Sequence, residues 1–335
     1  MAFPDVINTN PLGQENLAGS ELALFLKIFG GEVIERVKTM TLMEDKVMLR
    51  KVRGAQTVQF PGIGELSGAY HARGQNILDE AATGGSIIQQ VKHGELTIQV
   101  DRPLMSAVGI DDLEDVINHY DVRGPYSRAF AKFFAERWDR DVMRLMLKAA
   151  TAAASTYTVT DDHDDGYIVT NASAGTDAAE LLSALEEAER RFDEVDVPAE
   201  GRYVVLKPQQ YNLLTGPSAA LLDRDFGGEG NGRAADGTIM KAWGFTILKS
   251  NLLPQDNSTG ESVTGMNGET YIVDARNTVA LCFAKDAIGG VEALPLTFSA
   301  EPDWQTQQTV LVGRRATGLG VLRPERCIQI RSAAP

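Results

Sequence analysis

The sequence predicts an α+β protein built around one long helix and separate groups of strands. Residues 125–154 carry apolar side chains at steps of three and four with charged side chains between them, which is typical of an amphipathic helix. Pro125 suits the first helical position, because the missing N–H would have no intrahelical partner there. The residues expected to face inward are Tyr126, Phe130, Phe133, Phe134, Trp138, Val142, Leu145, Met146 and Ala149. About 30 residues of helix extend roughly 45 Å, a length that suits a scaffold better than a catalytic pocket.

The first third of the chain predicts an arm, a helix and a long insertion between two strands. Residues 1–19 are polar and aperiodic, and a helix capped by Ser20 should bend at Gly30 and Gly31 before the apolar Val33 and Val37. Strand-like alternation is expected within 47–60, with a return strand at 95–100. The glycine-rich stretch between these strands is long for a compact domain, and such an insertion is usually functional. An isolated two-stranded ribbon is marginal in water, so it needs a partner surface.

The second half mixes helices and strands. The sequence from Asp177 to Glu180 is similar to a capping box, which predicts that a helix starts there, with Phe192 facing inward. The other expected elements are a hairpin of 157–160 with 166–170, a buried strand at 202–207, a short helix at 208–214, strands at 245–248 and 271–274, and strands within 287–330 that return beside the long helix.

Composition limits the class of protein. The 335 residues suffice for about two domains, and the formal net charge of −14 comes from 46 acidic and 32 basic residues. This excess of acid argues against sequence-independent nucleic-acid binding, which needs clustered Lys and Arg. No apolar run approaches the length of a membrane span, and the first residues do not resemble a signal peptide. Cys282 and Cys327 both lie in apolar, strand-like segments and are expected to be buried free thiols.

No catalytic or metal-binding pattern stands out in the sequence. The acidic stretch 161–166 differs from a calcium loop, because His163 and Ala172 occupy positions that need oxygen ligands, so a solvated turn is expected. The four histidines and two cysteines lack zinc-ligand spacing. There is no nucleophile elbow and no phosphate-binding loop. We therefore expect no catalytic residue, no cofactor and no metal, and the protein is not expected to be an enzyme.

Four stretches carry a family resemblance. They are Leu22–Val33, Val58–Gly62 with Ala69 and Tyr70 after it, Asp112–Arg123, and Gly320–Glu325. Their sequences and order resemble the major capsid proteins of T7-like short-tailed bacteriophages (podoviruses). The matches are collinear and span residues 22–325, so the resemblance covers nearly the whole chain.

The resemblance implies the HK97-like capsid fold and its division into parts. These are an N-terminal arm at 1–54, an extended loop at 55–105, a peripheral domain at 106–176 and 283–335 with its spine helix at 125–154, and an axial domain at 177–282. In the family the extended loop reaches over the neighbouring subunit. The family forms pentamers and hexamers of an icosahedral shell around double-stranded DNA, in the virion, after assembly in the host cytoplasm.

The implied partners are further copies of the chain, a scaffolding protein and a portal protein, and a decoration protein is left open. DNA would be enclosed without sequence-specific binding, and no membrane is involved. An acidic inner wall would let the genome slide during packaging.

Two sets of residues follow from position and polarity within this expected fold. The candidate assembly residues are Arg73, Asn76 and Asp79 in the extended loop and Asp112, Asp115, His119 and Arg123 near the spine. The candidate hinges are Gly30, Gly31, Gly54, Pro103 and Gly124. Each of these residues could equally be an ordinary surface residue.

Two alternative functions remain open from the sequence. An encapsulin-like nanocompartment shell would share the fold, and the contents of its particles would differ. A hydrolase with an unrecognised site would need convergent polar groups in one closed pocket, and the sequence points to none.

Overall fold

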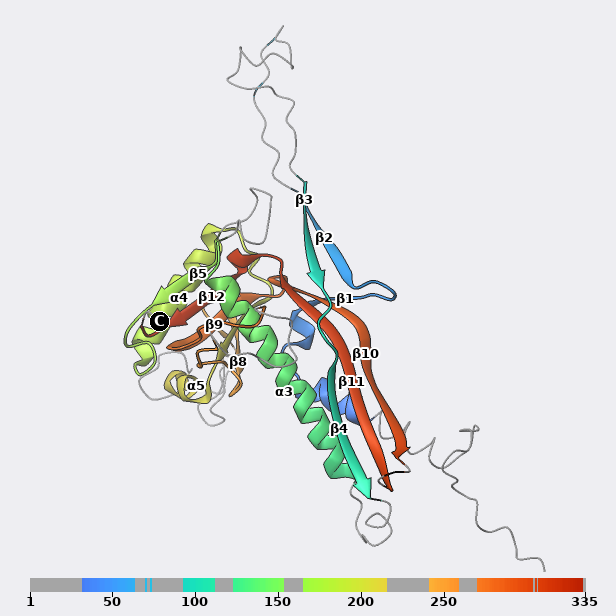
Figure 1. The fold of residues 1–335 in the computed structure, drawn as a ribbon. Helices are drawn as coiled ribbons and strands as arrows, with labels where there is room; N and C mark the ends of the chain where they lie inside the picture. The colour runs from blue at the N-terminus through green and yellow to red at the C-terminus, as the bar shows by residue number, and fades with distance from the viewer. Residues whose placement is uncertain are drawn as a thin grey trace, which may run out of the picture.

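The computed structural model describes residues 32–63, 70, 73, 93–111, 123–153, 165–215, 241–258, 270–303, 305 and 307–333. These residues form a rounded body and an elongated limb, and helix α3 (Arg123–Ala150) runs along both (Figure 1). The mixture of helices and sheets confirms the expected α+β class. Within the described part of the chain, no helix combines the length and apolarity that a bilayer crossing requires.

Helix α3 has 28 residues and is about 42 Å long at 1.5 Å per residue. It begins at Arg123 rather than at Pro125, so the proline lies inside the first turn, where backbone N–H groups have no intrahelical acceptor. It ends at Ala150, four residues before the expected end. The expected inward positions are buried at Phe130, Phe134, Trp138, Val142, Leu145, Met146 and Ala149. The expectation is wrong for Phe133, which is 41% exposed.

The limb contains a four-stranded sheet in the order β1–β10–β11–β4. Its strands are β1 (Met48–Lys51), β10 (Ile288–Asp303), β11 (Gln308–Val321) and β4 (Leu104–Asp111). Residues 32–40 form a helix whose Val33 and Val37 are buried in one cluster with Phe130, Phe134 and Leu311. The apolar face predicted at Val33 and Val37 is therefore covered by α3 and β11 of its own chain.

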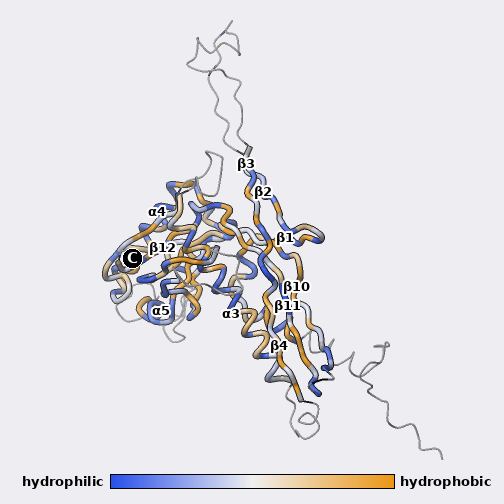
Figure 2. Tube along the Cα trace, in the orientation of Figure 1, coloured by the Kyte–Doolittle hydropathy of each residue, from blue (hydrophilic) through white to orange (hydrophobic). Residues whose placement is uncertain are grey.

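The rounded body contains a six-stranded sheet in the order β5–β12–β9–β6–β8–β7. Its strands are β5 (Tyr167–Thr170), β12 (Cys327–Arg331), β9 (Thr278–Ala284), β6 (Arg202–Leu206), β8 (Phe245–Lys249) and β7 (Lys241–Ala242). Helix α4 (Ala178–Glu194) covers one face and the C-terminal half of α3 covers the other, while α5 (Pro208–Thr215) follows β6. Hydrophobic residues are concentrated where these strands run together (Figure 2).

Helix α4 starts as its sequence predicts, with one difference. The side chain of Asp177 accepts a hydrogen bond from the backbone N–H of Ala179 at 3.0 Å, which satisfies one of the unpaired donors of the first turn. Glu180 does not complete a capping box, because its carboxylate accepts from the side-chain amide of Asn171 at 2.8 Å.

A two-stranded ribbon projects from the limb (Figure 1). It pairs β2 (Thr57–Ile63) with β3 (His93–Gln99) in antiparallel register, which confirms the return strand expected at 95–100. The strand-like region 47–60 is divided, because β1 joins the four-stranded sheet and β2 forms the ribbon.

Other expectations need correction. The segment 271–274 is not a strand, and within it only Asp274 forms an isolated bridge, with Asn257. The hairpin predicted for 157–160 with 166–170 is not tested, because 157–160 lies outside the described residues, and β5 pairs in parallel with β12 on one side. Strand β12 packs beside α3 as expected and also belongs to the six-stranded sheet, so this sheet includes strands from both sides of the expected axial segment.

The two cysteines lie on adjacent strands but on opposite faces of the sheet. Cys282 is the register partner of Ile328, and Cys327 is the register partner of Phe283. Cys282 packs in the cluster under α4, and Cys327 packs in the cluster under α3. Both are buried free thiols, as expected, and burial raises the pKa of each well above its ordinary value.

Candidate assembly surfaces

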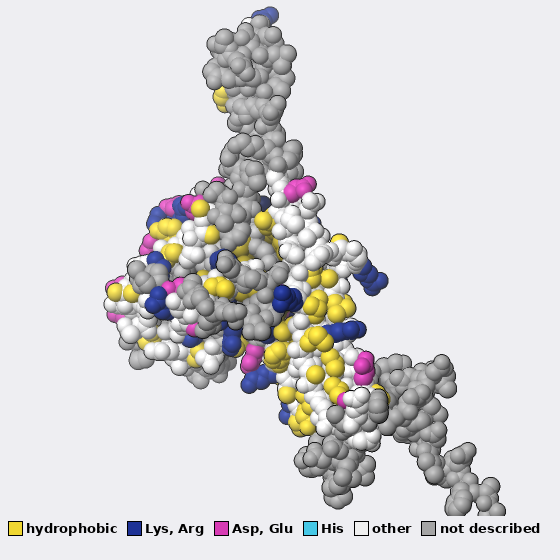
Figure 3. Space-filling view, viewed as in Figure 1, with side chains coloured by type: hydrophobic (Ala, Val, Ile, Leu, Met, Phe, Trp, Pro, Cys, Tyr) yellow, Lys and Arg dark blue, Asp and Glu magenta, His cyan; other side chains and the backbone are white. Residues whose placement is uncertain are grey.

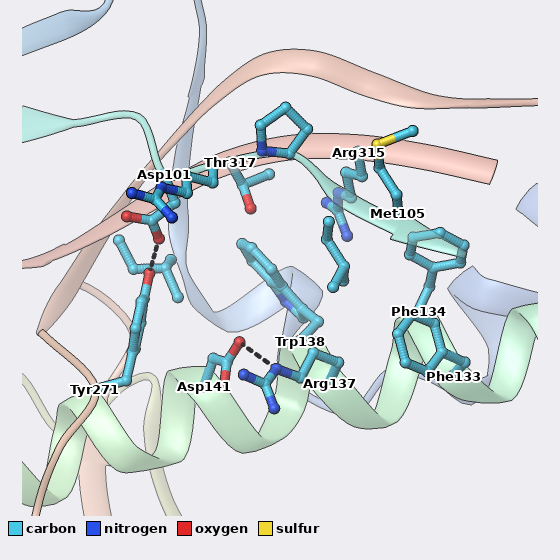
Figure 4. Close-up of a pocket in the computed structure, with 14 residues that line it drawn as sticks. Asp101, Met105, Phe133, Phe134, Arg137, Trp138, Asp141, Tyr271, Arg315 and Thr317 are labelled. Atoms are coloured by element: carbon cyan, nitrogen blue, oxygen red, sulfur yellow. Dashed lines mark hydrogen bonds and ion pairs between the residues drawn. The ribbon is translucent and has the colours of Figure 1, made fainter. Parts of the chain in front are cut away.

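An open groove lies between α3, the start of β4 and strand β11 (Figure 4). Its volume is about 440 Å³. Met105 and Phe133 form an apolar end, with exposed fractions of 58% and 41%, and Asp101, Arg137 and Asp141 line the remainder. Protein–protein contacts usually combine an apolar core with polar groups beside it, and the exposed apolar end of the groove next to its polar lining is compatible with that composition.

The polar groups of the groove hold one another in place. Tyr271 donates a hydrogen bond to the carboxylate of Asp101, and Arg137 forms an ion pair with Asp141 at 3.2 Å. Burial raises the pKa of Asp141 to about 7, although the charges of Arg137 and Arg144 oppose the shift. Burial, together with the charge of Asp101, also raises the pKa of Tyr271. These contacts fix the shape of the groove.

Arg315 joins three elements along the groove. Its guanidinium carbon lies 4.5 Å from the centre of the Trp138 ring. Its nitrogens lie 3.7 Å from Glu44, in the short helix η1 (Glu44–Lys46), and 3.5 Å from Glu292 on β10. Removing one partner of a buried charge is strongly destabilising, so this cluster holds η1, α3 and the limb sheet together.

Asp139 attaches the N-terminal segment to α3. Its buried carboxylate accepts hydrogen bonds from the backbone N–H groups of Leu42, at 2.9 Å, and Met43, at 3.1 Å. Burial raises the pKa of Asp139 to about 6, while these two hydrogen bonds favour the charged form. The segment after the first described helix is therefore fixed to the middle of the spine helix.

Strand β4 is one of the two edge strands of the limb sheet, and β1 is the other. Strand β4 pairs with β11 on one side, and among the described residues no strand pairs with its other side. Met105, Ala107 and Gly109 are exposed on it, and hydrophobic side chains gather over this part of the limb (Figure 3). A long edge strand with apolar side chains can pair with another chain.

The root of the ribbon is packed closely against β11. A Cβ atom on Gly318 would lie 2.2 Å from the carbonyl oxygen of Gln99, so only glycine fits. The N–H of Asp101 donates to the carbonyl of Thr317 at 3.0 Å, and Ile98 lies over Gly320. The second strand of the ribbon is therefore fixed to the limb where it leaves it.

The candidate assembly residues are only partly placed by the structure. Arg73 is exposed, and Arg123 is the first residue of α3. Asn76, Asp79, Asp112, Asp115 and His119 lie outside the described residues. The structure does not bring these residues together into a site.

The structure describes three of the five candidate hinges. Gly54 has a φ of +80° with open space around it, which favours glycine at that position. Pro103 lines the groove at the other root of the ribbon, and Gly124 is the second residue of α3. Gly30 and Gly31 lie outside the described residues.

Several exposed residues could not be singled out from the sequence. Phe133 fits the expected helical pattern and no strand was predicted around Met105, so only the fold shows that both side chains remain exposed. Trp243 is 43% exposed in the turn between β7 and β8, where Gly244 was an available signal for a turn. Within the described ranges no three His, Cys, Asp or Glu side chains are grouped in a way that could hold a metal ion.

The elongated limb with its ribbon and spine helix, beside a rounded mixed domain, defines the HK97-like class of capsid proteins. Residues 59–331 match the model of the Gp10A-like family, described as major capsid protein. The chain therefore belongs to this family, and it is a structural protein of a phage head rather than an enzyme.

Individual relatives agree with this assignment. The chain is 26% identical to the major capsid protein of Escherichia phage T7, with 92% of this chain and 91% of the relative covered. It is 28% identical to the major capsid protein of Enterobacteria phage T3, with 95% and 94% covered. Its fold matches the capsid structure of cyanophage P-SCSP1u with a TM-score of 0.75 and 29% identity, over 88% of this chain and 89% of that one.

Proposed function

We propose that copies of this chain form the pentamers and hexamers of an icosahedral phage head that encloses double-stranded DNA. The observation that carries this proposal is the limb itself, with an open edge strand β4 and an apolar groove end at Met105 and Phe133. Such surfaces are unfavourable on a lone chain and are suited to burial between copies. The family match favours a phage shell over the nanocompartment alternative and over a hydrolase.

The division into parts is also a proposal. We assign 1–54 to the arm, 55–105 to the extended loop, 106–176 and 283–335 to the peripheral domain, and 177–282 to the axial domain. The shared six-stranded sheet favours adding β5 and β12 to the axial domain. The candidate hinges would let one chain fit slightly different environments. The candidate assembly residues would make the contacts between subunits (Arg73, Asn76, Asp79, Asp112, Asp115, His119 and Arg123).

Further partners are proposed from the family assignment. A scaffolding protein would guide assembly in the host cytoplasm, a portal would occupy one vertex, and a decoration protein could be added to the outer surface. The DNA would be enclosed without sequence-specific contacts, and the net charge of −14 argues against strong sequence-independent binding as well.

Electron microscopy of the purified full-length chain tests this function, with Met105→Glu as the variant and Met48→Glu as a control of similar exposure. Both methionines are exposed, so neither variant should lose more than about 0.5 kcal/mol of folding stability. Closed particles are expected for the wild type and the control, and their loss is expected for Met105→Glu. A wild-type chain that stays monomeric at high concentration would refute the proposal.

A further inference from the structure

Trp243 lies at the tip of a two-residue turn with an unusual backbone. Ala242 on β7 pairs with Phe245 on β8, so Trp243 and Gly244 alone make the turn. Their φ angles are +46° and +74°. Positive φ at both central positions defines the type I′ hairpin turn, which favours Asn, Asp or Gly at the first of them. A bulky side chain is disfavoured in this conformation.

The turn is held firmly from the inner side. Phe245 and Ala242 are buried, and the ring of Phe245 lies 5.6 Å from that of Phe192 on α4. The position of a Cβ atom on Gly244 would be 3.4 Å from the carboxylate of Glu189, so α4 lies against the turn. The hairpin is the last unit of the six-stranded sheet, and it presents the indole from a rigid base.

The side chain itself is exposed on the chain. Trp243 keeps 43% of its surface accessible, although Ala242 and Phe245, which flank the turn, are buried. An aromatic ring exposed to water and a non-glycine residue in the left-handed backbone region each raise the free energy of the isolated chain. Both are offset if the indole is buried by a partner, and tryptophan is among the residue types most enriched at the positions that dominate protein–protein contacts.

We propose that Trp243 is an anchor between subunits, buried against a second copy of this chain. The inference rests on the proposed assembly of copies into pentamers and hexamers. A second copy is the favoured occupant because the chain belongs to a family of major capsid proteins, whose shells are built from many copies of one chain, and every copy carries this indole. Among the described residues no strand pairs with the outer side of β7.

The test uses Trp243→Asn in the full-length chain. Asn is preferred at the first central position of a type I′ turn, so the variant should fold with an unfolding midpoint equal to or above that of the wild type. The concentration needed for particle formation should rise at least tenfold, because the anchor is lost. Trp243→Phe, which keeps an aromatic ring, should restore part of the assembly.

Fluorescence supplies a second readout. The chain has three tryptophans, and Trp138 is buried in the free chain. In a Trp304→Phe background, the emission of Trp243 should be that of a solvated indole before assembly and should shift to shorter wavelength in particles.

The outcomes separate this inference from the proposed function. If wild-type chains form no closed particles, the proposed function fails and the inference fails with it. If the wild type assembles and Trp243→Asn assembles equally well, only the inference is refuted. An emission already blue-shifted in the free chain, or a variant that unfolds more easily than wild type, would show that the indole is covered by its own chain.

Discussion

Asp141 is a half-buried acid, with one fully buried carboxylate oxygen, in the groove proposed as an assembly surface. It lies on α3 in the groove, with Arg137 as its ion-pair partner at 3.2 Å and Asp101 as an unfavourable neighbour. Burial raises the pKa of Asp141 to about 7, and the pKa of Asp139, two residues earlier, is raised to about 6. Both shifts have the same sign, because removal from water disfavours the charged carboxylate.

The sign of the resulting pH dependence follows from these shifts. A folded pKa above the unfolded value means that the folded state binds more protons, so stability falls as the pH rises. For Asp141 the loss begins near 3.8, the ordinary pKa of an aspartate in the unfolded chain, and is complete above about 7. For Asp139 the corresponding loss of stability is complete above about pH 6.

We therefore expect Asp141→Asn to stabilise the unassembled chain at pH 8, by on the order of 2 kcal/mol, and to have little effect at pH 4. Denaturant unfolding across pH 4 to 8 measures this difference. Asp45→Asn, at an exposed position, is the matched control and should change little at either pH. Equal effects of Asp141→Asn at both pH values would contradict the assigned protonation.

At the scale of elements, the ribbon is held to the limb by a close backbone contact as well as by side chains. Gly318 on β11 meets the carbonyl of Gln99, and the N–H of Asp101 donates to the carbonyl of Thr317 at 3.0 Å. Ile98 packs with Val291 of β10. The opposite root at Gly54 has open space around it. The ribbon is thus fixed to the limb at the root of β3, and the hinge expected at Gly54 stays a prediction.

The close contact between Gly318 and the carbonyl of Gln99 gives a prediction for the ribbon. Gly318→Ala must displace the backbone of β3, and we expect a loss of about 1–3 kcal/mol of folding stability, in the range of overpacked cores. Gly175→Ala is the control, because its added Cβ would lie 3.7 Å from Val279, an ordinary contact. Thermal unfolding of both variants measures the difference. Similar midpoints for the two would show that β3 is not held there.

Elements with a clear period were predictable from the sequence, and elements defined by distant pairing were not. The three- and four-residue step indicated the position of α3, and the side chain of Asp177 indicated the start of α4. The segment 271–274 is apolar like a strand but has a single bridge, since β9 occupies the sheet position beside β12 and β6. The local sequence pattern does not decide which of two apolar segments joins the sheet.

At the scale of the whole molecule, the family could be inferred from sequence but the contact surfaces could not. Phe133 occupies an inward position of the helical pattern, and its exposure depends on how far β4 extends beside α3. Arg315 was not identified, although it links Glu44 and Trp138, which are far apart in the sequence. Such contacts depend on tertiary packing, and the local pattern of a sequence does not reveal them.

The net charge of the molecule affects the association of its copies. Each chain carries a formal charge of −14, so subunits repel one another before their apolar surfaces touch. The Debye length falls from about 30 Å at 0.01 M salt to about 10 Å at 0.1 M. Added salt therefore screens most of this repulsion but does not weaken the burial of apolar surface between subunits.

We therefore expect added sodium chloride to promote assembly, with the critical concentration falling several-fold between about 0.01 and 0.3 M. Light scattering at fixed protein concentration measures the onset, and electron microscopy confirms that the products are closed. Met105→Glu adds a further negative charge at the groove, and salt alone should not rescue it, because the lost contact is apolar. A critical concentration that rises with salt would instead mean that ion pairs between subunits dominate the contact, and the apolar surfaces described here would not be the main source of affinity.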